Sequence, residues 1–480
     1  MTRQLKPIPT PGCWFFAGAR RRSGRLHEGL AGLARQNGGI ALFRLWHRRL
    51  VAITDPEYAH QILVTHRERY LRGADNRSLR LLTGDGLLAT ENGHWLNRRR
   101  QIQPCFRANR AGDLVPAVCT SVQAMLDDWE TRRLSRRSVP ILAEMQNLAI
   151  LAIARTLFSA SPSRHEALRL AAAVRTGFRT VMQRAASLFA LPLCLPFPSC
   201  RKLRESRAVL DHFVNSRVDA RLAGSDPQAA DTLSALLASD DPETGAPLPR
   251  QGLLDELKSL IVAGFETTAA GLFWSLYLLA RHPEVAAKWY AELDRVLGGR
   301  TPTASDLPRL EYTSQVVHEA LRLYPPIHTL ARECVEDDEL DGYRMPRGVT
   351  VLISVYGIHR GAAWGPDPNT FRPERFAAAD WPRRAFLPFA NGRHLCLGNH
   401  FALAEMVTTL ALIGQRYHFE LTDERPLDAL AEISLVPSRE IPVLLHPRRS
   451  SRVARPAHPE AAYVGDARPM RCPFHQLLAS

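Results

Sequence analysis

The sequence has few cysteines, and they are not arranged as a framework. Eight cysteines are spread over 480 residues, no two of them form a CxxC pair, and their spacings show no regular pattern. This excludes a disulfide-scaffolded fold and favours a reducing compartment. A chain of this length can bury a large core without disulfide support.

The N-terminus also lacks a long apolar run. Its opening residues, MTRQLKPIPTPGCWFFAGARRR, contain no stretch of the length that a signal peptide or a membrane anchor needs. We therefore expect a cytoplasmic protein without a transmembrane anchor, whose contact with membranes is at most peripheral.

Lysine is scarce although the chain is basic. Only four of the 62 basic residues are lysine, the remainder are arginine, and the net charge is +14. The arginines are dispersed along the chain, whereas a nucleic-acid-binding protein more often clusters its charge on one arm or helix. We interpret the excess as mainly compositional and expect no nucleic-acid partner, with an acidic partner as the minor alternative.

One long apolar segment is present, between Lys258 and Arg281. Its 22 residues, SLIVAGFETTAAGLFWSLYLLA, would span ~33 Å as a helix, enough to cross a bilayer. Its only charge, Glu266, would lie near the bilayer centre at a cost of about 3 kcal/mol. A helix buried on all sides of a large protein is therefore the favoured interpretation, and a membrane span the alternative.

The middle of this segment carries adjacent polar residues, Glu266, Thr267 and Thr268. A threonine hydroxyl in a helix can bond the carbonyl four residues back, here that of Ala263, and Gly264 weakens the same turn. A buried acid and alcohol at a weakened turn suggest a functional site. The alternative is a polar kink whose groups are satisfied within the fold.

The remaining patterns indicate a mainly α protein with a small β part. A hairpin is expected over 40–54, and short strands between Leu330 and Val355. We expect one large domain over 40–446, preceded by an N-terminal segment over 1–39 and followed by a flexible tail over 447–480. Helices are expected at 93–108, 112–131, 140–159, 165–190, 200–223, 251–282, 283–297, 311–324 and 399–416.

Two glycine-rich segments invite a cofactor interpretation. Gly84-Asp85-Gly86-Leu87-Leu88-Ala89 fits the dinucleotide pattern GxGxxG/A, but no clear strand precedes it, so the match is weak. Cys396 is flanked by Gly392 and Gly398 and precedes a predicted helix. A helix N-terminus stabilises a thiolate, and flanking glycines allow a flat ligand to approach the backbone.

Taken together, the motifs resemble those of cytochrome P-450, a family of haem-thiolate monooxygenases. FANGRHLCLG at 389–398 matches the cysteine loop FxxGx(R/H)xCxG, although Ala390 stands where glycine is commoner. AGFETT at 263–268 matches the oxygen-activating motif of the long central helix. EALR at 319–322, FRPERF at 371–376 and WLNRR at 95–99 match three further motifs, all in family order over about residues 40–446.

The resemblance implies a haem b whose iron has the Cys396 sulfur as axial ligand. Phe389 would pack beside that sulfur, and Gly398 would hydrogen-bond it. Trp95, Arg99, Arg332 and His394 would bind the haem propionates, since the arginine fork suits carboxylates. Further residues implied at the haem are Gly392, Ala263 and Gly264. Glu319, Arg322 and Arg375 would form a structural charge network.

The implied reaction inserts one oxygen atom of O2 into an apolar substrate, such as a terpenoid or fatty acid. Thr267 would act in oxygen activation, Glu266 in proton delivery, and Gly264 would leave room for oxygen. A ferredoxin or flavodoxin with its reductase would bring electrons from NAD(P)H to a monomer. Suggested pocket residues are Ile327, His328, Leu330 and Val436, and suggested docking residues are Arg98, Arg100, Arg384 and Arg393.

Alternatives to this function remain open at the sequence level. A peroxygenase or isomerase of the same fold would use the same haem without the same demand for electrons. A haem-binding sensor would bind the cofactor without turnover. The presence of both Glu266 and Thr267 favours the monooxygenase.

Overall fold

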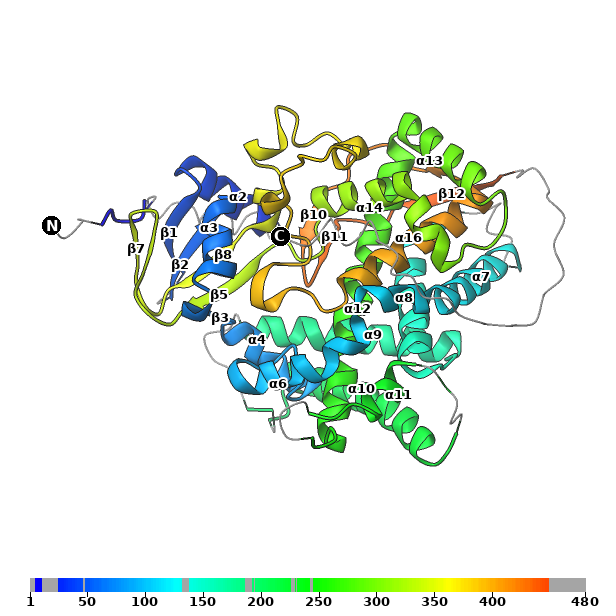
Figure 1. Ribbon diagram of the computed structural model, residues 1–480, viewed down its shortest axis with the longest axis horizontal. Helices are drawn as coiled ribbons and strands as arrows, with labels where there is room; N and C mark the ends of the chain where they lie inside the picture. The colour runs from blue at the N-terminus through cyan, green and yellow to red at the C-terminus, as the bar shows by residue number, and fades with distance from the viewer. Residues whose placement is uncertain are drawn as a thin grey trace.

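The computed structural model describes residues 5–10, 25–45, 48–131, 138–185, 192, 193, 195–225, 229, 231–241 and 245–448. The predicted tail therefore lies outside the described residues apart from its first two positions. A mixed sheet forms one end of the molecule, and helices form most of the rest (Figure 1).

The largest sheet has the strand order β1-β2-β8-β5-β3. Its strands are β1 (Ile40–Leu45), β2 (Arg48–Ile53), β8 (Thr350–Ile353), β5 (Leu330–Cys334) and β3 (Tyr70–Leu71). The predicted hairpin is β1 and β2, which pair antiparallel from Ile40 opposite Ile53, whereas β2 and β8 pair in parallel. Helix α2 (Leu26–Gln36), from the predicted N-terminal segment, buries Leu30 and Leu33 against this sheet.

Smaller sheets and short helices are distributed over the rest of the molecule. Strands β4 (Val139–Pro140), β12 (Pro442–Pro447) and β9 (Tyr417–Leu421) form one sheet, while β10 (Ala429–Ala431) pairs with β11 (Leu435–Pro437), and β6 (Asp338–Leu340) with β7 (Tyr343–Met345). The short helices are α3 (Pro56–His60), α4 (Ala74–Ser78), α5 (Arg80–Thr83) and α15 (Val355–Ile358).

The predicted helices form with small shifts at their ends. The helix expected over 93–108 is shorter, because Pro104 has no N–H to continue it and residues 103–106 form a 3-10 turn. The last residues of the helix predicted over 165–190 lie outside the described part. The long helices are α6 (Asn92–Ile102), α7 (Val115–Thr131), α8 (Ile141–Phe158), α9 (Arg164–Ala185), α10 (Pro198–Leu222), α12 (Arg250–Arg281), α13 (Pro283–Val296), α14 (Glu311–Leu323) and α16 (Asn399–Arg416), with the short α11 (Thr232–Leu237) before α12.

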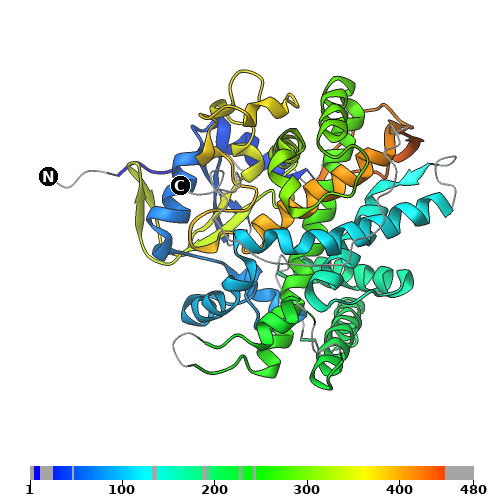
Figure 2. The same ribbon diagram turned by 45° about the vertical axis from the view of Figure 1, so that its right-hand side comes forward.

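Helix α12 contains the long apolar segment and passes through the middle of the helical part (Figures 1 and 2). It packs against α8, α10, α14 and α16, and it is buried along most of its length. Helix α8 is the second helix that is long and apolar enough to cross a membrane, and it too is mostly buried inside the fold. Burial by other helices thus accounts for the apolar composition of both.

Candidate functional site

One turn of α12 has exposed surface although the helix is otherwise buried. Ala263 is exposed and Thr267 is half-buried, while Phe265 between them is fully buried. The Thr267 hydroxyl donates to the Ala263 carbonyl at 2.7 Å, the back-bond expected from the sequence. Because Ala263 and Thr267 are four residues apart, their exposed surfaces lie on the same face of the helix.

Gly264 lies where α12 packs against α8. A Cβ atom on this residue would lie 2.7 Å from Cδ1 of Ile153 in α8. The missing side chain therefore lets α8 pack closely against α12, and the expected role of this glycine in leaving room for oxygen stays a prediction.

Helices α12 and α16 meet where Gly271 contacts Met406: a Cβ on the glycine would lie 2.8 Å from the methionine methyl carbon. Ala263 lies ~12 Å before this contact along α12 at 1.5 Å per residue. Cys396 lies three residues before the start of α16 at Asn399.

The cysteine loop contains a backbone hydrogen bond and two residues with a positive φ. The Cys396 amide donates to the Phe389 carbonyl at 2.9 Å. Gly392 has a φ of +68°, and a Cβ there would lie 1.9 Å from the Leu63 carbonyl oxygen, so only glycine fits. Ala390 has a φ of +60°, which means that this alanine adopts the left-handed conformation that glycine takes more easily.

The Cys396 sulfur lies inside the fold but is not covered. The residue is exposed by surface area, yet desolvation raises the pKa of its thiol, against the lowering effects of the Gly398 amide and Arg99. Both observations fit a sulfur that faces an interior space enclosed by protein. A thiol in this environment would become a thiolate on binding a metal ion.

Next to this loop, Trp95 is surrounded by cationic groups. The indole of Trp95 is 3% exposed, and its ring centre lies 4.6 Å from that of His394. The guanidinium carbons of Arg72, Arg99 and Arg393 lie 5.8, 6.0 and 5.3 Å from the ring centre. The structure thus brings together three of the four residues expected at the propionates.

The fourth, Arg332, is a buried cation without an acidic partner. It is 5% exposed and donates to the carbonyl of Ala331 at 2.8 Å; among the described residues, no carboxylate oxygen lies within ion-pair distance of it. Burial and the charge of Arg72 lower its pKa to about 10. Buried charges require a counter-charge, so this cluster fits the two carboxylates of a haem.

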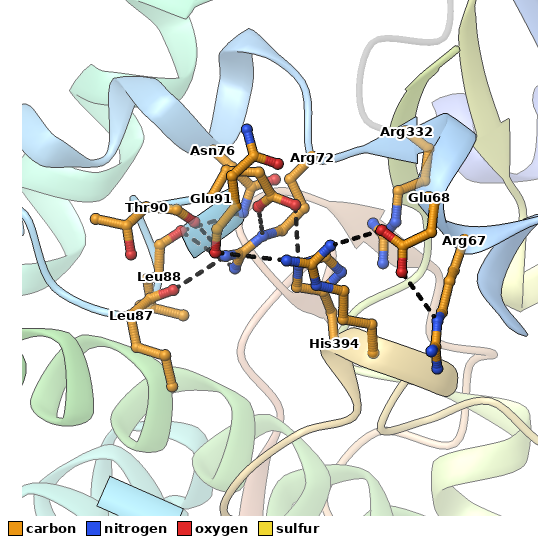
Figure 3. Close-up of polar contacts among 12 residues, drawn as sticks. Arg67, Glu68, Arg72, Asn76, Leu87, Leu88, Thr90, Glu91, Arg332 and His394 are labelled. Atoms are coloured by element: carbon orange, nitrogen blue, oxygen red, sulfur yellow. Dashed lines mark hydrogen bonds and ion pairs between the residues drawn. The ribbon is translucent and has the colours of Figure 1, made fainter. Parts of the chain in front are cut away.

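Two members of the cluster were not recognised from the sequence, Glu91 and Arg72. Figure 3 shows Glu91 between Arg72 and His394. Arg72 Nε donates to Glu91 Oε2 at 2.8 Å, and His394 Nε2 lies 3.0 Å from Glu91 Oε1. These contacts lower the pKa of Glu91 to about 2 against the effect of burial. The only local sequence signal was the position of Glu91 just before WLNRR.

Glu266 is a buried acid beside the exposed turn. It is 5% exposed, and burial raises its pKa to about 7, against the influence of Arg175 and Arg179. Its Oε1 accepts a long bond of 3.5 Å from the Ser434 hydroxyl. An acid with a pKa near neutrality can both accept and give a proton under physiological conditions.

The structure also brings together the expected charge network. Arg322 Nε and Nη2 donate to the two oxygens of Glu319 at 2.6 and 2.7 Å, and neither side chain is exposed. Arg375 Nε lies 3.4 Å from Glu319 Oε1. His359 extends this network: its Nδ1 contacts the Arg322 carbonyl at 3.0 Å, and its Nε2 accepts from the Leu387 amide at 2.7 Å.

The suggested pocket residues separate into two groups. Ile327 and Leu330 are half-buried, and Val436 lies on β11, on the hairpin that also carries Ser434. His328 contacts Thr329 Oγ1 at 3.0 Å, and its ring centre lies 5.8 Å from that of His27 in α2. Burial lowers the pKa of His328 to about 4, so it is a neutral group packed beside α2.

Among the suggested docking residues, Arg98 is largely covered. Its side chain is 15% exposed, and its Nε lies 3.8 Å from Glu256 of α12, so it contributes little to the surface. Arg384 is exposed and pairs with Glu57, whereas Arg393 is largely covered, beside Glu68.

The dinucleotide-like segment also has a structural explanation. The amides of Asp85 and Leu87 donate to Asp255 and Glu256 of α12, both at 2.9 Å. A Cβ on Gly84 would lie 2.2 Å from the Asp255 carboxylate. The glycines therefore allow this loop to pack closely against α12.

Comparison with known proteins gives consistent results. Residues 3–444 match the family model described as cytochrome P450. Cyclooctatin synthase of Streptomyces melanosporofaciens is 32% identical over 85% of this chain and 89% of the relative. Cyclooctat-9-en-7-ol 5-monooxygenase of the same organism is 33% identical over 79% of this chain and 82% of the relative. The crystal structure of a mutant heme domain of cytochrome P450DA superposes with a TM-score of 0.81 at 25% identity, covering 94% of this chain and all of that chain.

Proposed function

The chain belongs to the cytochrome P450 family and is a haem-thiolate monooxygenase, and from this premise we propose that Cys396 binds the haem iron. The supporting observation is the position of its sulfur, which lies inside the fold and remains accessible. The haem, which we propose to be haem b, supplies the activation of O2 when bound.

Trp95, Arg99, Arg332 and His394 would hold the haem at its propionates. Arg332 provides the strongest argument, because its buried guanidinium otherwise has no acidic partner among the described residues. Phe389, Gly392 and Gly398 shape the cysteine loop, while Glu319, Arg322 and Arg375 support it from beneath through His359 and Leu387.

Thr267 and Glu266 would deliver protons at the exposed turn of α12. The Thr267 hydroxyl is held by the Ala263 carbonyl, so its oxygen can accept a further hydrogen bond and its position is fixed. Glu266 can exchange protons near neutral pH because burial raises its pKa to about 7. Together they offer a proton donor and a fixed hydroxyl on neighbouring residues of one helix.

The electrons come from a redox partner, as they do in this family. We propose an acidic ferredoxin or flavodoxin that is reduced by a reductase at the expense of NAD(P)H, acting with a monomer in the cytoplasm. The basic composition of the chain supports an acidic partner. Reduction should slow as salt increases, because screening weakens attraction between exposed charges.

We propose a terpenoid as the substrate class. Cyclooctatin synthase and cyclooctat-9-en-7-ol 5-monooxygenase are relatives over most of the chain, and the second, by its name, acts on a cyclic alcohol. Ile327, Leu330 and Val436 offer an apolar lining for such a substrate.

A direct test titrates the purified holoprotein with cyclic terpene alcohols and with fatty acids, followed by the spin-state change in its absorption spectrum. Compounds that bind are then incubated with ferredoxin, its reductase and NADPH. We expect a hydroxylated terpenoid that incorporates one atom of labelled O2. Hydroxylation of fatty acids alone would contradict the substrate class, and label-free products would contradict the monooxygenase.

A further inference from the structure

The Glu91 carboxylate joins two segments that are distant in the sequence. Its Oε1 lies 3.0 Å from His394 Nε2 in the cysteine loop. Its Oε2 accepts from Arg72 Nε at 2.8 Å. The Glu91, Arg72 and His394 side chains are 11%, 10% and 9% exposed, so the charges of Glu91 and Arg72 are poorly screened by solvent.

Arg72 extends this connection to the loop before α6. Its Nη2 donates to the carbonyls of Leu87 and Thr90, and its Nη1 lies 3.5 Å from the Leu88 carbonyl (Figure 3). The amide of Leu87 is bound from the opposite side by Glu256 of α12. The loop is therefore fastened to α12 through its amides and to Arg72 through its carbonyls.

The other cations of the cluster are not bound to Glu91. Arg332 has no carboxylate partner among the described residues, and neither has Arg99, whose guanidinium carbon lies 6.0 Å from the ring centre of Trp95. The Glu91 carboxylate thus neutralises the charge of Arg72 and contacts His394, whereas the charges of Arg332 and Arg99 remain available to an anionic ligand. The contact of Glu91 with Nε2 fixes the orientation of the His394 ring.

We propose that Glu91 is a positioning residue that fastens the cysteine loop to the loop 84–90 and holds His394 at the propionate edge of the haem. This inference rests on the proposed binding of haem by Cys396. It assigns to Glu91 two measurable effects: slower loss of haem, and a negative charge near the haem that opposes reduction of the iron.

The test compares Glu91→Gln with Glu68→Gln in the haem-loaded protein. Glu68 is a matched control, because it also carries a carboxylate beside Arg393 but is 71% exposed. Haem transfer to excess apomyoglobin gives the dissociation rate, and a redox titration gives the midpoint potential. Hydrogen exchange of the backbone amides of residues 84–90 measures how firmly this loop is held.

We expect Glu91→Gln to lose haem several-fold faster, to exchange faster in 84–90, and to have a higher midpoint potential. A tenfold change in the equilibrium constant for reduction corresponds to 59 mV. Glu91→Asp keeps the charge with a shorter reach, so its potential should return toward wild type while haem loss stays fast. Glu68→Gln should change none of these quantities.

The inference is overturned if Glu91→Gln equals wild type in haem loss and potential, or if Glu68→Gln produces equal changes. If Glu91→Gln does not fold, two other variants test the inference. An unchanged rate of haem loss in Glu91→Asp would refute it, and so would unchanged hydrogen exchange of residues 84–90 in Arg72→Lys. A wild-type protein without the thiolate spectrum would refute the proposed function instead, so the two failures are distinguishable.

Discussion

Arg322 and Glu319 form a two-pronged ion pair in the interior, with N–O distances of 2.6 and 2.7 Å and no exposure of either side chain. Arg322 also donates to the carbonyls of His359 and Pro368. It therefore joins α14 to the segment that leads to the cysteine loop.

Replacement of Arg322 by methionine should destabilise the protein by about 3–5 kcal/mol, because Glu319 is left as an uncompensated buried charge. Chemical denaturation of the two proteins measures the difference. Arg425→Met is the control, since Arg425 pairs with Asp423 at the surface and is 77% exposed, and should leave stability nearly unchanged. Equal losses in both variants would contradict a special role of the buried pair.

Replacement of Thr267 by alanine should uncouple electron use from product formation. The variant lacks the hydroxyl that the Ala263 carbonyl fixes at the exposed turn, so the product formed per NAD(P)H consumed should fall by about tenfold or more. Thr268→Ala, which alters a buried neighbour on the same helix, should have a smaller effect. An unchanged product yield in Thr267→Ala would refute the assignment.

Glu266 should make stability depend on pH. Its folded pKa of about 7 is raised above the ordinary value of 4.5, so the folded state holds the proton more tightly than the unfolded chain. The ionised Glu266 carboxylate therefore lowers the free energy of unfolding. This loss is absent below pH 4.5 and grows as pH rises to about 7, where it reaches about 3 kcal/mol.

Glu266→Gln should therefore match wild type in thermal stability near pH 5 and exceed it at pH 8, while product formation falls. Melting curves at both values measure this, with the exposed Glu424→Gln as the control. A constant difference between variant and wild type across this range would contradict the raised pKa.

Ala390 in the cysteine loop offers a stabilising substitution. Because its φ is +60°, Ala390→Gly should stabilise the protein by about 1 kcal/mol. The same change at the exposed Ala220, inside α10, should destabilise it by a similar amount. Denaturation midpoints of the two variants measure the effects, and a shift in the same direction for both would refute the strain at Ala390.

Residues in contiguous motifs were accessible from the sequence. Cys396, Thr267 and the Glu319–Arg322 pair could be predicted because each belongs to a short segment whose spacing carries the chemistry. Periodicity located the helices, and the buried position of α12 followed from its composition and its single acid.

Contacts between distant segments could not be predicted in the same way. Nothing local indicates that Glu91 reaches His394, or that His359 supports the loop at Leu387. The packing of Gly264 was inaccessible for the same reason, because its neighbour Ile153 belongs to another helix. The dinucleotide-like glycines matched a pattern but serve the packing of a loop on α12.

The most direct test of the account is the absorption spectrum of the reduced, carbon monoxide-bound protein. We predict a strongly red-shifted Soret band in wild type and in Cys105→Ser, a buried cysteine on another segment, and its loss together with turnover in Cys396→Ser. A Cys396→Ser protein that retains the band and the turnover would contradict the central claim.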